Sequence, residues 1–188
     1  MDKTQFGVYH LSDQPELYEI QRDNNFEFII TDIDNLIRAG ADETDTEAVI
    51  VNAQHTLRYS VTEAFIPNFT QEVITVSRGN SVIKAAGKPS FSDGTIVVND
   101  YIGADTKSAL MAWQRLSYDV KSDVVGSMKD YKKTCYLLEY DPSFNLIRTW
   151  KLVGCFVSGI SENSYNAESS SKKVISATIA YDRAIPEV

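Results

Sequence analysis

The chain has 188 residues, of which 18 are lysine or arginine and 26 are aspartate or glutamate, so its formal net charge is -8 at pH 7. A protein that grips nucleic acid by neutralising phosphates carries a basic surface, and this acidic composition argues against that class. Hydrophobic residues make up 43% of the chain, which is enough for one domain with a core and excludes disorder throughout.

No part of the sequence approaches the roughly 18 to 20 consecutive apolar residues that a membrane-spanning helix needs. The start of the chain, with Asp2 and no apolar segment behind it, does not resemble a secretory signal, so we expect the product to stay where it is made. We expect the two cysteines, Cys135 and Cys155, to be free, buried thiols that pack as small hydrophobic residues.

The first part of the chain shows no sustained period. Residues 1–24 are predicted to form an N-terminal arm, and residues 25–188 a single domain. Residues 25–33 are aromatic and β-branched, which predicts the first core strand. An insertion loop is predicted over about 34–54. Its acidic residues form either a plain solvated loop or, less commonly, a patch that faces a lumen or a partner; they are Asp42, Glu43, Asp45 and Glu47.

The next part of the chain has the pattern of β structure. Alternation over 57–63 predicts a strand, and a second strand is predicted over 72–77. Gly79 and Asn80 separate two β-like runs and predict a two-residue hairpin turn. The Gly-Lys-Pro sequence at 87–89 predicts the next corner of the chain.

One amphipathic helix is predicted from Asp105, which suits an N-cap, to Val120. The spacing i, i+4, i+7 and i+11 places four apolar side chains on one face: Ala109, Trp113, Leu116 and Val120. We expect Trp113 and Leu116 to anchor this helix on a sheet, because an aromatic stripe at helical spacing is far more often part of a core than of a cofactor site.

The last third of the chain is predicted to be β again. Residues 131–140 and 146–156 are expected to pair as antiparallel strands. Gly154 and Gly159 predict a bulge or a close approach of the backbone. The regular alternation over 173–181 predicts a strand with one buried face and one small, polar face.

The residues available for catalysis or metal binding are few. The only histidines, His10 and His55, are interpreted as surface residues. Either cysteine paired with His55 would make a nucleophile and base, but no local motif supports such a pair. Spacings typical of zinc, calcium or phosphate sites do not occur. We therefore expect no enzyme activity, no catalytic residues, no cofactor and no metal.

Residues 56–183 resemble the tail-tube protein of contractile-tailed bacteriophages in the order of several motifs. In that family a glycine-led turn, a Phe-x-Asp corner, a strand ending in Asn-Asp and a helix with Trp-Gln follow one another. Here the turn, the corner and the strand lie in residues 86–100, and the Trp-Gln helix includes residues 112–114. Residues 130–133 resemble a Tyr-Lys segment of the family, and residues 175–182 resemble its closing strand. Residues 152–158 are similar to a Gly-hydrophobic-Pro region of the family, although Val157 and Ser158 stand where a proline is usual.

The resemblance implies a mainly β (α+β) fold, in which an antiparallel β-sandwich or barrel-like subunit carries one flanking amphipathic helix. It also implies a structural virion protein whose hexameric rings stack into the inner tube of a contractile tail, the conduit for DNA ejection. The implied partners are other copies of the chain, the tail sheath protein, the baseplate, the tail terminator, the tape measure protein and DNA in the lumen. Such a protein is assembled in the host cytoplasm and ends in the virion tail.

The charge of the chain agrees with a conduit, because a bore with few lysines and arginines would not hold passing DNA. We expect the hairpin 73–84 and the insertion 34–54 to contact the next ring, and the helix 105–120 to face the sheath. Two alternatives remain open. One is a baseplate or terminator protein with the same fold, and the other is a small β-barrel module that binds a ligand.

Overall fold

The computed structural model describes residues 19–33, 36–37, 49–50, 52–168 and 170–187. Most of these residues lie in strands, which confirms the predicted mainly β fold class. The helices are α1 (Ala53–Ser60), α2 (Thr106–Ser117) and α3 (Met128–Tyr131). The strands are β1 (Phe26–Ile30), β2 (Leu36–Ile37), β3 (Val49–Ile50), β4 (Val61–Glu63), β5 (Phe69–Arg78), β6 (Ser81–Phe91), β7 (Gly94–Asn99), β8 (Tyr118–Asp119), β9 (Val124–Val125), β10 (Lys133–Tyr140), β11 (Leu146–Glu162), β12 (Val174–Ala180) and β13 (Arg183–Glu187). No helix in the described part is long and apolar enough to cross a membrane.

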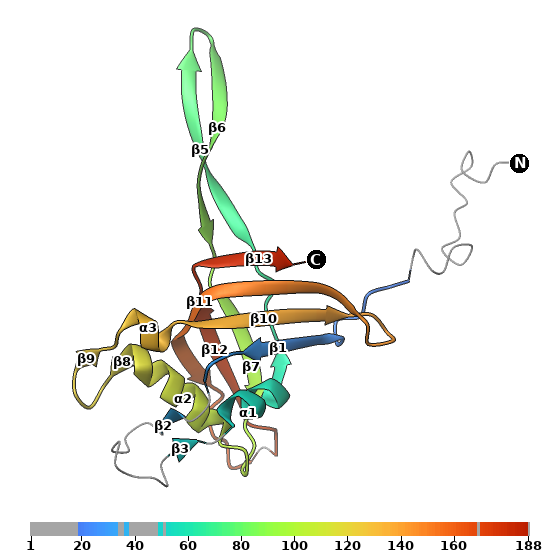
Figure 1. Ribbon diagram of the computed structural model, residues 1–188, viewed down its shortest axis with the longest axis vertical. Coiled ribbons are helices and arrows are strands. Elements are labelled where there is room, and N and C mark those ends of the chain that lie inside the picture. Colours follow the sequence, from blue (N-terminus) through green and yellow to red (C-terminus); the bar gives the residue numbers. More distant parts are fainter. Residues whose placement is uncertain (1–18, 34–35, 38–48, 51, 169, 188) are drawn as a thin grey trace, which may run out of the picture.

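One antiparallel sheet dominates the molecule. Its strands follow the order β1-β10-β11-β12-β7-β4, and β13 pairs with β11 beside this path. The long strand β11 pairs with β10 through residues 146–155 and with β12 through residues 156–162, so it joins the two halves of the sheet (Figure 1). The sheet is nearly closed into a barrel. Its end strands are β1 and β4, and the opening between them is called the seam below.

Two glycines shape β11, as the sequence predicted. Gly154 has a φ of +75°, and a Cβ at this position would lie 2.2 Å from Oδ2 of Asp182. The N–H of Asp182 donates to the carbonyl oxygen of Val153 at 3.0 Å, at the corner between β12 and β13. Gly159 lies at a register shift between β11 and β12. Because only glycine adopts a positive φ without steric cost, residue 154 can bend where the returning chain comes closest.

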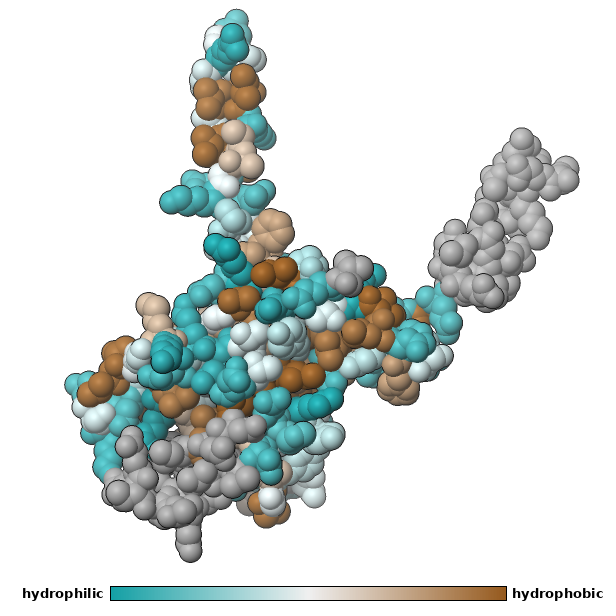
Figure 2. All heavy atoms as spheres, viewed as in Figure 1, coloured by the Kyte–Doolittle hydropathy of each residue, from teal (hydrophilic) through white to brown (hydrophobic). Residues whose placement is uncertain are grey.

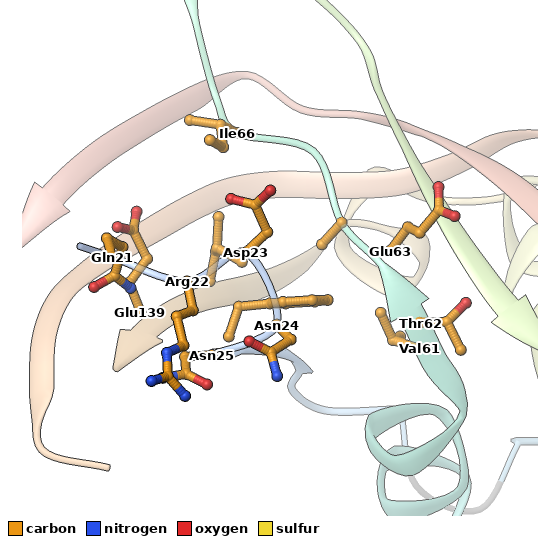
Figure 3. A pocket seen from close by; sticks show the side chains of 13 residues that line it. Gln21, Arg22, Asp23, Asn24, Asn25, Val61, Thr62, Glu63, Ile66 and Glu139 are labelled. Atoms are coloured by element: carbon orange, nitrogen blue, oxygen red, sulfur yellow. The ribbon is translucent and has the colours of Figure 1, made fainter. Parts of the chain in front are cut away.

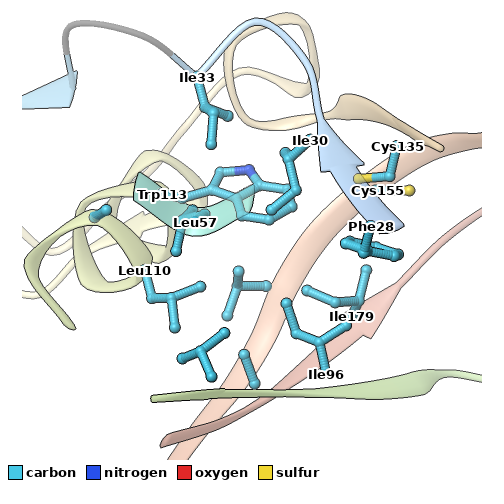
Figure 4. Packing of buried hydrophobic residues seen from close by; sticks show 14 of the residues in the cluster. Phe28, Ile30, Ile33, Leu57, Ile96, Leu110, Trp113, Cys135, Cys155 and Ile179 are labelled. Atoms are coloured by element: carbon cyan, nitrogen blue, oxygen red, sulfur yellow. The ribbon is translucent and has the colours of Figure 1, made fainter. Parts of the chain in front are cut away.

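The core lies between the curled sheet and the helices α1 and α2 (Figure 4). The indole of Trp113 is fully buried, and its Nε1–H donates to the carbonyl oxygen of Tyr131 at 3.0 Å. Leu116 packs against the same cluster from its partly buried edge. The alternation predicted for the last long strand is confirmed, because β12 buries three side chains of one face: Ile175, Ala177 and Ile179.

The amphipathic helix is present as α2, with different ends from those predicted. Asp105 occupies the N-cap position in a left-handed conformation, and its side chain makes no capping hydrogen bond. The helix ends at Ser117 and the chain continues into β8. Val120 therefore lies outside the helix and is 82% exposed, so its predicted place on the buried face was wrong.

The strand predicted over 57–63 is wrong for most of its length, because this segment forms helix α1 and only then the short strand β4. Alternating Leu57 and Tyr59 favoured a strand, yet Tyr59 is 77% exposed. The buried residues of α1 are Ala53, Leu57 and Ser60, which follow the helical period. Packing decides the conformation here, since Ser60 Oγ lies 3.0 Å from Oγ1 of Thr106 and so links α1 to α2.

The predicted hairpin is present as β5 and β6, and it is longer than the sequence suggested. Its turn consists of Gly79, with a φ of +60°, and Asn80. The corner predicted at 87–89 is wrong, because β6 continues through these residues to Phe91. Gly87 instead lies near a register shift, and a Cβ there would be 2.8 Å from the carbonyl oxygen of Glu72. Figure 1 shows the hairpin projecting far from the barrel.

Candidate assembly surface

The hairpin exposes an unusual amount of apolar surface. Every residue of β5 is exposed, and so are most residues of β6. Ile74 pairs with Ala85 and Val76 with Ile83, and residues directly opposite in an antiparallel ladder share a face. This apolar face of the hairpin is thus defined by Ile74, Val76, Ile83 and Ala85, and about half of each of the three larger side chains is exposed. Figure 2 shows the apolar residues on the shaft and hydrophilic ones at the tip.

Aromatic rings hold the foot of the hairpin on the barrel. Phe69 and Phe91, which pair across β5 and β6, have ring centroids 5.7 Å apart. Phe91 in turn lies 5.9 Å from Tyr181, and Tyr181 lies 5.5 Å from Phe65. The series ends in the core, where Phe65 is 6.1 Å from the buried ring of Phe28. These contacts orient the hairpin through its foot, although its shaft contacts solvent on both faces.

The hairpin also differs in charge from the rest of the chain. Residues 69–91 contain three basic residues, Arg78, Lys84 and Lys88, and one acidic residue, Glu72, for a net charge of +2. The remaining residues include fifteen basic and twenty-five acidic ones, for a net charge of -10. A basic, apolar projection therefore extends from an acidic body.

A groove runs along the seam of the barrel and is called the seam groove here. Its volume is about 630 Å³, and its walls are the lead-in to β1 on one side and β4 on the other (Figure 3). Phe26, Val61, Leu137 and Ile66 supply apolar surface. The charged residues that line it are Arg22, Asp23, Glu63 and Glu139. A smaller hollow of about 420 Å³ shares Asn24, Asn25, Phe26 and Val61 with it and so continues the groove past α1.

An ion pair in the lining of the smaller hollow joins α1 to β1. Arg58 Nε donates to Oε1 of Glu27, and the hydroxyl of Tyr140 donates to Oε2 of Glu27 at 3.1 Å. The hydrogen bond from Arg58, followed by that from Tyr140, holds the pKa of Glu27 below its usual value although partial burial opposes this. The pKa of Tyr140 is raised, mainly by burial and then by its bond to Glu27. This cluster fixes one wall of the seam.

A second groove of about 740 Å³ lies between the end of α2 and β11. Met111, Tyr118, Val120 and Phe156 give it an apolar lining, and its charged residues are Arg115, Asp119 and Lys121. Arg115 and Asp119 form an ion pair at 3.2 Å. This helix-end groove carries a net charge of +1.

The residues singled out from the sequence lie in three different places. Gly79 and Asn80 form the tip of the hairpin, at the greatest distance from the barrel in Figure 1. Trp113 and Leu116 lie in and beside the core. The four acidic residues of the predicted insertion, Asp42, Glu43, Asp45 and Glu47, fall outside the described residues, as do residues 1–18 of the predicted arm.

The structure does not assemble the nucleophile and base that the sequence left open. His55 is exposed on α1 and stacks on Tyr59 with ring centroids 6.4 Å apart. Cys135 and Cys155 are free thiols, as expected, and both are fully buried in the core. Within the described ranges, no three His, Cys, Asp or Glu side chains are grouped to hold a metal ion.

No protein-family model and no curated protein matches the sequence. Solved structures do match. A chain of the sheath-tube complex of an extracellular contractile injection system, PVC, in the extended state is 15% identical, with a TM-score of 0.62 over 95% of this chain and 99% of that chain. This chain has the fold of contractile-injection-system tube proteins.

Two further structures with this tube fold agree. The PVC sheath/tube terminator is 17% identical, with a TM-score of 0.63 over 91% of this chain and 98% of that chain. The tube-terminating cap of the anti-feeding prophage is 13% identical, with a TM-score of 0.63 over 100% of this chain and 99% of that chain. The resemblance to tail-tube proteins in the sequence is thereby confirmed at the level of the fold.

The seam groove and the apolar face of the hairpin were not found from the sequence. The groove combines residues 21–26, 61–66 and 137–139, which are distant in the chain and carry no shared motif. The apolar face had a local signal, because Ile74 and Val76 alternate on one strand and Ile83 and Ala85 on the next. The sequence does not show that these four side chains are exposed. Their exposure follows from the length of the hairpin, which carries them away from the rest of the described subunit.

Proposed function

We propose that the chain is a structural subunit that polymerises as stacked hexameric rings into the inner tube of a contractile tail or injection system. The observation that carries this proposal is the projecting hairpin, with an exposed apolar face, on a subunit that has the tube fold. An isolated two-stranded hairpin is only marginally stable in water, so this one gains its stability by packing against other copies.

The proposed tube would surround a bore for DNA, with the tape measure protein present during assembly. The net charge of -8 per subunit supports a wall that does not hold the duplex, because phosphate neutralisation by lysine and arginine supplies most non-specific affinity. The sheath would cover the outside, where we place α2, and the baseplate and terminator would contact the two ends. The proposed location is the virion tail or its injection-system equivalent, after assembly in the cytoplasm of the producing cell.

A terminator or baseplate role is the second candidate, because two of the three structures above are a terminator and a terminating cap. The ligand-binding barrel has less support. The interior of this barrel is filled by side chains such as Trp113, Phe28 and Ile179, and the two larger hollows are open surface grooves. The proposed subunit has no catalytic role; His55 is exposed, whereas Cys135 and Cys155 are fully buried.

Negative-stain electron microscopy and light scattering on the purified chain distinguish these candidates. Long hollow tubes or stacked rings are expected from a tube subunit. A single stable ring that does not stack supports the terminator or baseplate role. A monomer at all concentrations contradicts both proposals and supports the binding module. Deleting residues 38–47, which keeps the buried Leu36 and strand β2, tests whether the insertion contacts the next ring. The variant should fold without polymerising, and tubes of normal length would contradict that contact.

A further inference from the structure

We propose that the apolar face of the hairpin of one copy docks in the seam groove of a second copy. This inference rests on the proposed function, because it names the two surfaces through which subunits join. The hairpin projects away from its own barrel in Figure 1 and leaves its own groove uncovered. The hairpin of another copy is the occupant that the apolar and charged residues of the two surfaces favour.

The apolar parts of the two surfaces match in kind. Ile74, Val76 and Ile83 present half-exposed side chains in a row along the hairpin. Phe26 and Leu137 line the groove, and Ile66 at its upper end is 70% exposed. Contact would remove both sets from water, and this burial is the main favourable contribution in protein association. It would also give the free hairpin the packing partner that it lacks within the described subunit.

The charges of the two surfaces are opposite. The hairpin carries a net charge of +2. Arg78 lies near the tip on the same side as the apolar face, and Lys84, which pairs with Thr75, lies on the reverse side. The residues that line the seam groove include three acids, Asp23, Glu63 and Glu139, and one base, Arg22, for a net charge of -2. Arg148 forms an ion pair with Glu139 at 3.2 Å, so Asp23 and Glu63 supply most of the negative charge. The helix-end groove is also apolar, but its net charge of +1 has the same sign as the hairpin. Charge thus selects the seam groove, since like charges across an interface are unfavourable.

The backbone of the seam also suits an incoming β element. In the described part of the sheet, β1 pairs only with β10 and β4 only with β7, so the edges that face the seam have no strand beside them. Open strand edges present N–H and C=O groups that can pair with another chain. Covering them by a hairpin from a second copy would remove these edges from solvent.

Docking of a hairpin into a groove joins two different surfaces of the same chain. Such head-to-tail contacts propagate, and they give a ring if the rotation closes and an open helical filament if it does not. The hairpin-groove contact therefore supplies one of the two repeats in a tube of stacked rings, and a second contact between copies supplies the other.

Charge reversal tests the contact with two variants. The first, Arg78→Glu with Lys84→Glu, makes the hairpin acidic, and the second, Asp23→Lys with Glu63→Lys, makes the groove basic. In each variant alone, the hairpin and the groove have charges of the same sign and repel each other. In a mixture, the acidic hairpin of the first variant can dock in the basic groove of the second, and the basic hairpin of the second can dock in the acidic groove of the first. We expect neither variant to assemble alone, and we expect an equimolar mixture to form assemblies with the two copies alternating.

Matched controls carry the same changes in net charge at other exposed positions. They are Lys129→Glu with Lys172→Glu for the first variant and Glu19→Lys with Glu168→Lys for the second. Circular dichroism verifies that each variant folds, and electron microscopy with sedimentation scores assembly. The controls should assemble like the unmodified chain.

The outcomes separate this contact from the proposed function. Assembly of the unmodified chain and of both reversed variants would overturn the hairpin-groove contact and leave the tube proposal standing. Failure of the equimolar mixture, with both variants folded and the unmodified chain assembling, would also overturn the contact. No assembly by the unmodified chain would contradict the tube proposal itself.

Discussion

The rings of Phe91 and Tyr181 lie 5.9 Å apart, at a tilt of 56°, where the hairpin leaves the barrel. Tyr181 also stacks on Phe65 with centroids 5.5 Å apart, so one side chain connects the hairpin to the core. Tyr181 is only 7% exposed, and its position directly after β12 places it at the corner toward β13. The orientation of the hairpin therefore depends on a residue about ninety positions further along the chain.

Tyr181→Leu should lower the free energy of unfolding by about 1 to 3 kcal/mol, because two aromatic pairs and part of a buried ring are lost. Urea denaturation followed by circular dichroism measures this change. Tyr59→Leu, at an exposed ring on α1, is the matched control and should change stability by no more than about 0.5 kcal/mol. Equal effects of the two substitutions would show that the aromatic series does not support the structure.

Gly154→Ala should destabilise the fold, because alanine at a φ of +75° is strained and its Cβ would collide with Asp182. Asp182 receives two contacts from Nζ of Lys132, at 2.8 and 2.7 Å, and this ion pair would be displaced. The free energy of unfolding should fall by about 2 kcal/mol or more, since the left-handed conformation alone costs alanine about 1 to 2 kcal/mol.

Gly159→Ala is the control for this prediction. A Cβ at residue 159 meets no heavy atom within 4 Å, and no positive φ is found there. Thermal denaturation should therefore give nearly the same melting temperature for this variant as for the unmodified chain. If Gly159→Ala lowered the melting temperature as much as Gly154→Ala does, the close approach of residue 154 to Asp182 would not explain the destabilisation.

The sequence predicted those features that depend on neighbouring residues. The alternation of Ile175, Ala177 and Ile179 gave the correct buried face of β12, and Gly79 with Asn80 gave the correct turn of the hairpin. These patterns succeed because the period of a strand and the backbone requirements of a tight turn are local properties. The mainly β fold class followed from the same patterns and from the resemblance to tail-tube proteins.

The features that the sequence did not predict depend on distant contacts. Leu57 and Val61 fit both a strand and a helix, and the contact of Ser60 with Thr106 shows what decides between them. The seam groove could not be predicted, because Asp23, Glu63 and Glu139 meet only when β1 and β4 become the two ends of one sheet. The exposure of Val120 followed from the early end of α2, which the i+11 spacing could not show.

Acidification should weaken the link between α1 and β1. The pKa of Glu27 is lowered in the folded chain by the hydrogen bonds from Arg58 and Tyr140, so the folded state binds its proton less readily than the unfolded state does. Its contribution to stability is therefore complete above the usual glutamate value of 4.5 and is lost as the pH falls through the lower, folded value.

Glu27→Gln tests this pH dependence. The substitution should lower the melting temperature at neutral pH, and the difference from the unmodified chain should shrink as the pH falls well below 4.5. Glu168→Gln changes an exposed carboxylate on the surface and should leave the profile unaltered. A difference for Glu27→Gln that stays constant across the pH range would contradict the assignment.

The two thiols should be unreactive in the folded chain. Burial, followed by contact with the sulfur of Cys155, raises the pKa of Cys135 well above its usual value, and both residues are fully buried. A thiolate is the reacting form, so Ellman's reagent at mildly alkaline pH should label neither cysteine until denaturant is added. Rapid labelling of the native chain would show that the region between β10 and β11 opens readily.

Assembly through the hairpin is the central claim, and shortening the hairpin tests it most directly. Deleting residues 73–76 together with 83–86 removes four residues from each strand and the whole apolar face, and it keeps the turn and the aromatic foot. Electron micrographs of the two proteins at equal concentration should show hollow tubes for the unmodified chain and folded single subunits for the shortened one. Tubes from the shortened chain, or none from the unmodified chain, would contradict the account.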